Sequence, residues 1–156
     1  MEITNEQAMK LAIQQAYDGI RNGDGGPFGC VIVKDGKVIG QGHNCVVKNN
    51  DPTCHGEVQA IRDACKNTKN FDLSGSILYT TAQPCPMCLG AILWANIKQV
   101  YQGCNIKDTD TIGFRDDKFY DYLNGKGNLL SIQELDRTSC LKLFSDYNAL
   151  ENKTQY

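Results

Sequence analysis

Pro84-Cys85-Pro86-Met87-Cys88 and, earlier in the chain, His55-Gly56-Glu57 are the stretches of sequence that decide the fold. Together they offer one imidazole and two thiolates, the protein ligands of a zinc site whose fourth position stays open to water. Zinc in such a site lowers the pKa of bound water to roughly 7, which makes hydroxide available at neutral pH. Glu57, two residues after the histidine, is placed to carry protons, and we expect it to be the catalytic acid and base.

The order of the two motifs argues against other uses of the cysteine pair. Cys-x-x-Cys alone also occurs in redox proteins and structural zinc knuckles. A His-x-Glu motif followed by Pro-Cys-x-x-Cys is the signature of zinc-dependent base deaminases. A closed structural site would need a fourth ligand, and His43 and Cys54 lack the usual ligand spacing to the others. We therefore predict one zinc ion per chain, held by His55, Cys85 and Cys88.

Length and charge favour a single enzyme domain with a small substrate. The 156 residues, 41% of them hydrophobic, are enough for one domain with a proper core, which we place at residues 1–156. The net charge is -2 and the sequence pI is about 5.6. Proteins that grip a nucleic-acid backbone are usually basic over the binding face, so a nucleic-acid partner is disfavoured.

Cysteine use and hydropathy predict a cytoplasmic protein. No apolar stretch is long enough to span a membrane, and the polar start Glu2-Ile3-Thr4-Asn5-Glu6 does not resemble a secretory signal. The chain has eight cysteines, of which the metal site takes two. Most of the others lie in apolar runs such as Gly29-Cys30-Val31-Ile32-Val33, where a free thiol behaves as a small hydrophobe. A reducing compartment is therefore expected.

Hydrophobic periodicity predicts alternating helices and strands. Thr4 and Gln7 form a capping box for a helix that ends near Asn22-Gly23. Helices are also expected from about His55 to Lys66, from Pro86 onward and from about Ser139, and strands at 30–33, 38–42, 76–81 and 99–104. The Asp35-Gly36 pair predicts a hairpin turn. This order indicates an α/β fold whose mixed sheet is covered by helices on both faces.

At these motifs the chain resembles the cytidine-deaminase-like superfamily, over nearly its whole length. The more specific matches are Gly25-Gly26-Pro27-Phe28-Gly29, the run Asn50–His55, the run 84–91, Gly113–Phe119 and the terminal Asn152-Lys153-Thr154-Gln155-Tyr156. The last two are similar to those of bacterial guanine deaminases. The resemblance implies a three-layer α/β/α sandwich with a five-stranded sheet. It also implies a homodimer in which residues from about 139 to 156 swap over the partner's active site.

The resemblance also implies roles for residues outside the metal motifs. Asn44 would hydrogen-bond a purine, and Phe28 would lie beside its ring. Asp116 would accept hydrogen bonds from the guanine edge, and Tyr156 of the swapped segment would close the pocket. The implied reaction is zinc-dependent hydrolysis of guanine to xanthine and ammonia.

Three residues depart from the family pattern. Gly56 stands where guanine deaminases usually have alanine. Fungal cytosine deaminases also have glycine at this position. Gln83 replaces the glutamate that usually precedes Pro-Cys, and Arg115 replaces an acidic residue, which leaves Asp116 and Asp117 as alternative contacts. Guanosine, cytosine and tRNA adenosine therefore remain alternative substrates. A zinc-stabilised dimerisation or binding module is the non-enzymatic alternative, which the presence of Glu57 disfavours.

Overall fold

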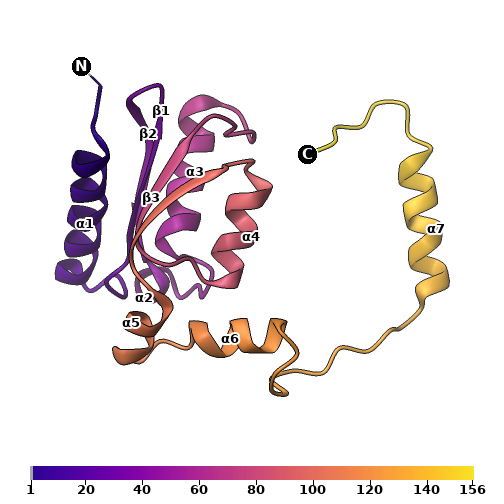
Figure 1. Cartoon of the computed structure of the whole chain (residues 1–156). Helices are drawn as coiled ribbons and strands as arrows, with labels where there is room; N and C mark the ends of the chain where they lie inside the picture. The colour runs from indigo at the N-terminus through magenta and orange to yellow at the C-terminus, as the bar shows by residue number, and fades with distance from the viewer. Residues whose placement is uncertain (1) are drawn as a thin grey trace.

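The computed structural model of the chain describes residues 2–156, and Met1, the first residue of the predicted domain, lies outside them (Figure 1). The helices are α1 (Asn5–Asn22), α2 (Val46–Asn49), α3 (Gly56–Thr68), α4 (Pro86–Trp94), α5 (Ile106–Thr111), α6 (Asp116–Leu123) and α7 (Arg137–Asn148). The strands are β1 (Gly29–Lys34), β2 (Lys37–His43), β3 (Ile77–Ala82) and β4 (Gln99–Cys104). Among the described residues, no helix combines the length and apolar character that crossing a membrane requires.

The strands form one mixed sheet in the order β2-β1-β3-β4. β1 pairs antiparallel with β2 and with β3, and β3 pairs parallel with β4. Asp35 and Gly36 form the predicted hairpin turn, with φ angles of 51° and 75°. The mixed sheet is confirmed, but the prediction of five strands is wrong, since residues 2–156 contain four. The fifth came from the family resemblance, and after β4 the chain turns into α5 instead of a further strand.

Alternate side chains of β1 pack against helices on opposite faces of the sheet. Cys30 and Ile32 belong to a buried cluster with residues of α3, α4 and the segments around them. Val31 and Val33 belong to a second cluster with Ala8 and Ala12 of α1. This period of two is the expected pattern of a strand that is covered on both sides. In Figure 1, α1 lies on one face of the sheet and α3 and α4 lie on the other.

Close approach of the helices to the sheet requires glycine at two strand positions. At Gly29, an added Cβ would come within 2.0 Å of the carbonyl oxygen of Ala12 in α1. At Gly40, it would come within 2.6 Å of the carbonyl oxygen of Ala60 in α3. Both contacts are with helix backbone, so the absence of a side chain sets how tightly α1 and α3 sit on the sheet.

The C-terminal part of the chain extends away from the sheet. Every residue from 123 to 156 is exposed, and Figure 1 shows α7 well separated from α3 and α4. The predicted C-terminal helix is present and begins at Arg137. Its exposed apolar side chains include Leu141, Leu143, Phe144 and Tyr147. An isolated helix of this length is marginal in water, so such a face is typical of one that packs against another surface.

Candidate active site

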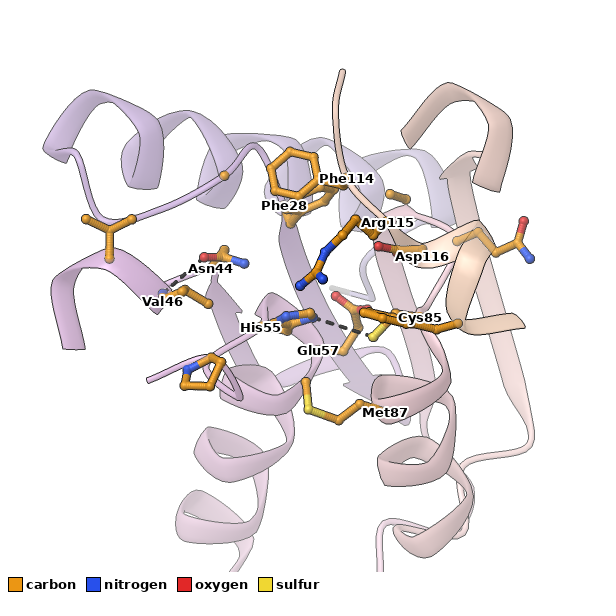
Figure 2. Close-up of a pocket in the computed structure, with 16 residues that line it drawn as sticks. Phe28, Asn44, Val46, His55, Glu57, Cys85, Met87, Phe114, Arg115 and Asp116 are labelled. Carbon is orange, nitrogen blue, oxygen red and sulfur yellow. Dashed lines mark hydrogen bonds between the residues drawn. The ribbon is translucent and has the colours of Figure 1, made fainter. Parts of the chain in front are cut away.

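The N-termini of α3 and α4 bring the metal motifs together. His55 is the N-cap residue of α3, Cys85 is the N-cap residue of α4, and Cys88 lies in the first turn of α4. Pro86 occupies the start of α4, where a missing N–H costs no hydrogen bond. Both helices point their free amides and positive dipole ends toward the cluster, which favours negatively charged ligands there. Figure 2 shows His55 and Cys85 facing one another across the site.

The donor geometry fits a zinc ion. His55 Nδ1 lies 3.6 Å from Cys85 Sγ and 3.6 Å from Cys88 Sγ. In a tetrahedral site with zinc–sulfur bonds of ~2.3 Å and zinc–nitrogen bonds of ~2.1 Å, such ligand atoms lie about 3.6 Å apart. The three donor atoms all lie within 4.8 Å of one another, and both cysteines are buried. The three predicted ligands therefore meet the requirement of an open, three-ligand zinc site.

Electrostatics at the cluster also suit a metal. Hydrogen bonds from Cys88 and from His55 lower the pKa of Cys85 to about 4, although burial opposes them. The pKa of Cys88 is raised because its thiol donates to Cys85 and is buried. Two thiols that share a proton in this way bind a dication by releasing that proton.

Glu57 lies in the first turn of α3 and is buried, with 6% of its surface exposed. Burial raises the pKa of this carboxyl to about 7, against the opposing effect of a hydrogen bond from Cys88. A carboxyl with a pKa near the working pH can both accept and return a proton. In Figure 2 its side chain lies beside Cys85 at the floor of the cavity.

A cavity of about 510 Å³ opens above the metal ligands, within the range of small-molecule sites. It is lined by Gly26, Phe28, Asn44, Val46, Val47, Pro52, His55, Glu57, Ala82, Gln83, Cys85, Met87, Phe114, Arg115, Asp116 and Phe119. Four of the predicted site residues, Phe28, Asn44, Glu57 and Asp116, therefore share this cavity with two of the three metal ligands.

Asn44 and Phe28 lie on the side of the cavity formed by β2 and the 24–28 loop. Asn44 is buried, and its Oδ1 accepts a hydrogen bond of 3.1 Å from the Val46 amide. Figure 2 shows the amide nitrogen of Asn44 turned toward the cavity. Phe28 packs edge-to-face on Phe114, with ring centroids 4.9 Å apart. Phe28 thus acts as both a cavity wall and a packing residue.

Asp116 opens α6 and faces the cavity, whereas Asp117 is not among the residues that line it. Burial raises the pKa of the Asp116 carboxyl. Tyr156 lies elsewhere: it does not line the cavity of its own chain. Its ring centroid lies 5.8 Å from that of Trp94 and 6.2 Å from that of Phe71.

The structure adds α6 and two side chains to the predicted site. No helix was predicted between β4 and residue 139, but Tyr120 of α6 donates a hydrogen bond to the carbonyl of Pro84 and fixes α6 beside the metal loop. Arg115, noted in the sequence only as a departure, lines the cavity. Gln83 also lines it, and its Oε1 accepts a hydrogen bond of 3.0 Å from the Ile106 amide. The amide at position 83 thus anchors the start of α5.

Comparison with known proteins shows two kinds of relative. Residues 2–104 match the cytidine and deoxycytidylate deaminase zinc-binding region. The guanine deaminase of Bacillus subtilis is 40% identical over 99% of this chain and 100% of its own length. The tRNA-specific adenosine deaminase of Buchnera aphidicola subsp. Schizaphis graminum is 39% identical over 89% of this chain and 90% of its own.

Solved structures of the two kinds of relative differ in how well, and over how much of its length, they superpose on this chain. The crystal structure of the Bacillus subtilis guanine deaminase superposes with a TM-score of 0.93 at 41% identity, covering 99% of both chains. A structure from a study of tRNA:A34 deaminases superposes with a TM-score of 0.62 at 38% identity, covering 65% of this chain and 72% of the other. The likeness to the former therefore includes the segments that follow β4.

Proposed function

The chain belongs to the family of deaminases that share the cytidine and deoxycytidylate deaminase zinc-binding region, and we propose that its substrate is guanine. The reaction is hydrolysis of the 2-amino group of guanine to give xanthine and ammonia. One observation carries the choice of substrate: the likeness to a guanine deaminase extends with a TM-score of 0.93 over 99% of the chain, including α5, α6 and α7. The three-layer α/β/α arrangement belongs to the same proposal, supported by buried clusters that involve opposite faces of β1.

The proton steps fall to Glu57. Zinc held by His55, Cys85 and Cys88 would lower the pKa of a bound water to roughly 7, so that hydroxide is available as the nucleophile at neutral pH. The Glu57 carboxylate would accept the proton that the attacking water loses as the oxygen adds to C2 of guanine. It returns that proton to the ring, takes a second proton from the hydroxyl group now on C2, and passes it to the amino group, which leaves as ammonia while the C2 carbonyl of xanthine forms. Burial raises the pKa of Glu57 to about 7, so this carboxyl can both accept and donate a proton at neutral pH.

The remaining cavity residues bind and orient the base. With its Oδ1 occupied by Val46, Asn44 presents N–H donors to an acceptor on the purine. Asp116 offers acceptor oxygens to the N–H groups of the guanine edge, and Phe28 offers an apolar surface to the ring. Together these contacts supply affinity for the base and keep it in the cavity beside the metal ligands.

We further propose that the protein is a homodimer in which residues of about 139–156 cover the partner's active site, with Tyr156 closing the cavity. Support comes from the exposed apolar side chains of α7 and from the distance between α7 and the sheet of its own chain (Figure 1). Exchange of an identical element between protomers is a low-cost route to a dimer.

A cytoplasmic location is part of the proposal, supported by the free state of all the cysteines.

The likeness to tRNA-specific adenosine deaminases makes tRNA the second candidate substrate. The net charge of -2 disfavours it, since binding to a nucleic-acid backbone depends on basic surface. The experiment is a panel of guanine, guanosine, cytosine, cytidine, adenine and a tRNA substrate, with detection of ammonia or of inosine. Guanine as the preferred substrate supports the proposal, and turnover of tRNA without turnover of guanine replaces it with the second candidate.

A further inference from the structure

We propose that Asp24 and His43 form a positioning pair that sets the direction of the Asn44 amide and thereby the affinity of the enzyme for its base. The inference rests on the proposed function, because it concerns how the base is held. Neither residue lines the cavity, so both act through Asn44.

The His43 ring is held at both of its nitrogens. Nε2 lies 2.8 Å from Asp24 Oδ2, and Nδ1 lies 3.0 Å from Gln15 Oε1 of α1. Asp24 is 6% exposed, so the carboxylate and the imidazole meet largely out of water, where such a hydrogen bond is stronger than at the surface. His43 is the last residue of β2, and Asn44 follows it directly.

The fold makes room for this ring. Gly19 lies in the buried face of α1, and an added Cβ there would come within 2.6 Å of His43 Cδ2. Glycine inside a helix is destabilising relative to alanine, so its presence here has a structural reason. The ring of His43 occupies the space that this glycine leaves.

Asp24 also ties together the segments that surround Asn44. Its backbone N–H donates to the carbonyl of Gly19, and its carbonyl accepts from the amides of Val47 and Lys48 at 3.0 and 2.9 Å. These last two bonds hold the start of α2, a helix that the sequence did not predict. One residue thus connects the end of α1, the end of β2 and the beginning of α2.

Asn44 is confined by the neighbours of this pair. An added Cβ at Gly25 would come within 2.1 Å of Asn44 Oδ1, so the 24–28 loop lies directly against the amide. The backbone N–H of Asn44 donates to the carbonyl of Phe28 at 2.9 Å, and Oδ1 accepts from Val46 of α2. With these contacts in place, the amide nitrogen is left to face the cavity (Figure 2).

Loss of the pair is therefore expected to affect binding more than chemistry. Glu57 and the three metal ligands come from α3 and α4, which Asp24 and His43 do not hold. A misdirected Asn44 amide weakens the hold on the base while the proton steps continue. The expected signature is a higher KM with kcat retained.

A metal ion is the competing explanation for this cluster. Asp24, His43 and Cys45 offer donor atoms that lie within 4.8 Å of one another. His43 Nε2 is already hydrogen-bonded to Asp24, and Cys45 Sγ donates to the carbonyl of His43 at 3.4 Å. Every donor thus has a protein partner, which favours the positioning pair.

The test compares steady-state kinetics of the zinc-loaded parent with Asp24→Ala, His43→Ala, Asn44→Ala and the double variant Asp24→Ala/Asn44→Ala. Asp24→Ala and His43→Ala are expected to raise KM about tenfold, about the effect of losing one hydrogen bond to the base, with kcat within about twofold. Asp24→Asn keeps an acceptor for His43 and is expected to restore most of the affinity. In the Asn44→Ala background, Asp24→Ala is expected to add no further loss. Asp18→Ala, which removes a half-buried carboxylate of α1 that accepts a hydrogen bond from Gln14, is the matched control.

Two further measurements keep the outcome decisive. Metal analysis is expected to give one zinc per chain in the parent and in His43→Ala; a second metal ion that His43→Ala removes would overturn the pair in favour of a metal site. The side-chain amide signal of Asn44 in ¹⁵N-labelled protein is expected to shift on Asp24→Ala, whichever base the parent deaminates. An unchanged signal, an unchanged KM, or a full additional loss in the Asn44→Ala background would overturn the inference, whereas an inactive parent would overturn only the proposed function.

Discussion

His55 and Cys85 are the N-cap residues of two different helices, and Nδ1 of the first lies 3.6 Å from Sγ of the second. The zinc site is thus formed where α3 and α4 begin, and it fixes the two helix ends relative to one another. Neither N-cap makes a side-chain hydrogen bond to its own helix. Both side chains are consequently available to a metal.

Removal of a ligand should remove the metal. Cys88→Ala is expected to reduce zinc from one per chain to a small fraction and to lower the melting temperature, because a ligand that binds only the folded state stabilises it. Metal analysis and thermal unfolding, before and after chelation, measure both effects. Cys104→Ala alters an exposed cysteine outside the site and should retain zinc. Full zinc content in Cys88→Ala would show that the metal is held elsewhere.

Replacement of Glu57 should separate metal binding from turnover. Glu57→Gln keeps the shape of the side chain but cannot accept a proton, so kcat is expected to fall by about 10²–10⁴-fold while zinc content is unchanged. Glu134→Gln, an exposed change of the same kind, is the control. Turnover within a few-fold of the parent would mean that another group moves the proton.

Packing of α1 on the sheet should tolerate no side chain at position 29. Gly29→Ala places a Cβ against the backbone of Ala12 and is expected to cost about 1–3 kcal/mol of unfolding free energy. Gly90→Ala in α4 meets nothing within 4 Å and is expected to be neutral or to stabilise by up to about 1 kcal/mol. Denaturant unfolding of the two variants measures the difference. Equal stability would show that α1 sits further from β1 than the structure has it.

Deletion of Thr154-Gln155-Tyr156 should lower guanine deamination and spare folding and zinc. The physical reason is that a covered cavity excludes water and holds the base, which a missing end cannot do. Kinetics and melting temperature of the truncated protein measure this. Unchanged kinetics would exclude Tyr156 from the site.

Mixing of two defective proteins distinguishes a swapped end from one that acts on its own chain. The truncated protein keeps Glu57, and Glu57→Gln keeps Tyr156. In a mixed dimer with swapped ends, the active site that retains Glu57 receives the end of the other chain, so activity is expected to return after unfolding and refolding together. Refolded mixtures no more active than the sum of the two proteins would argue that the end acts in its own chain.

The features that depend on neighbouring residues in the sequence were predicted, and those that depend on distant contacts were missed. The hairpin at Asp35-Gly36 follows from the turn preferences of those two residues and is present in the structure. The metal set follows from ligand types and spacing, and the structure brings its three donor atoms within 4.8 Å of one another. The helix α2 was missed because the Asp24 carbonyl, distant in sequence, holds its first turn. α6 was missed because Tyr120 fixes it to Pro84 through a tertiary contact. The fifth strand was expected from resemblance alone. The predicted role of Tyr156 also came from the resemblance, and in its own chain the ring lies near Trp94 and Phe71 and outside the cavity.

Guanine is the expected substrate of this zinc-dependent enzyme. The most direct measurement is kcat/KM of the zinc-loaded protein for guanine beside guanosine and an anticodon-loop adenosine substrate, with xanthine and ammonia quantified together. Equal amounts of xanthine and ammonia are expected from guanine, with loss of both in Glu57→Gln and a kcat/KM for guanine well above that for either competitor. A protein that converts the tRNA adenosine or guanosine more efficiently, or releases no ammonia from guanine, would contradict it.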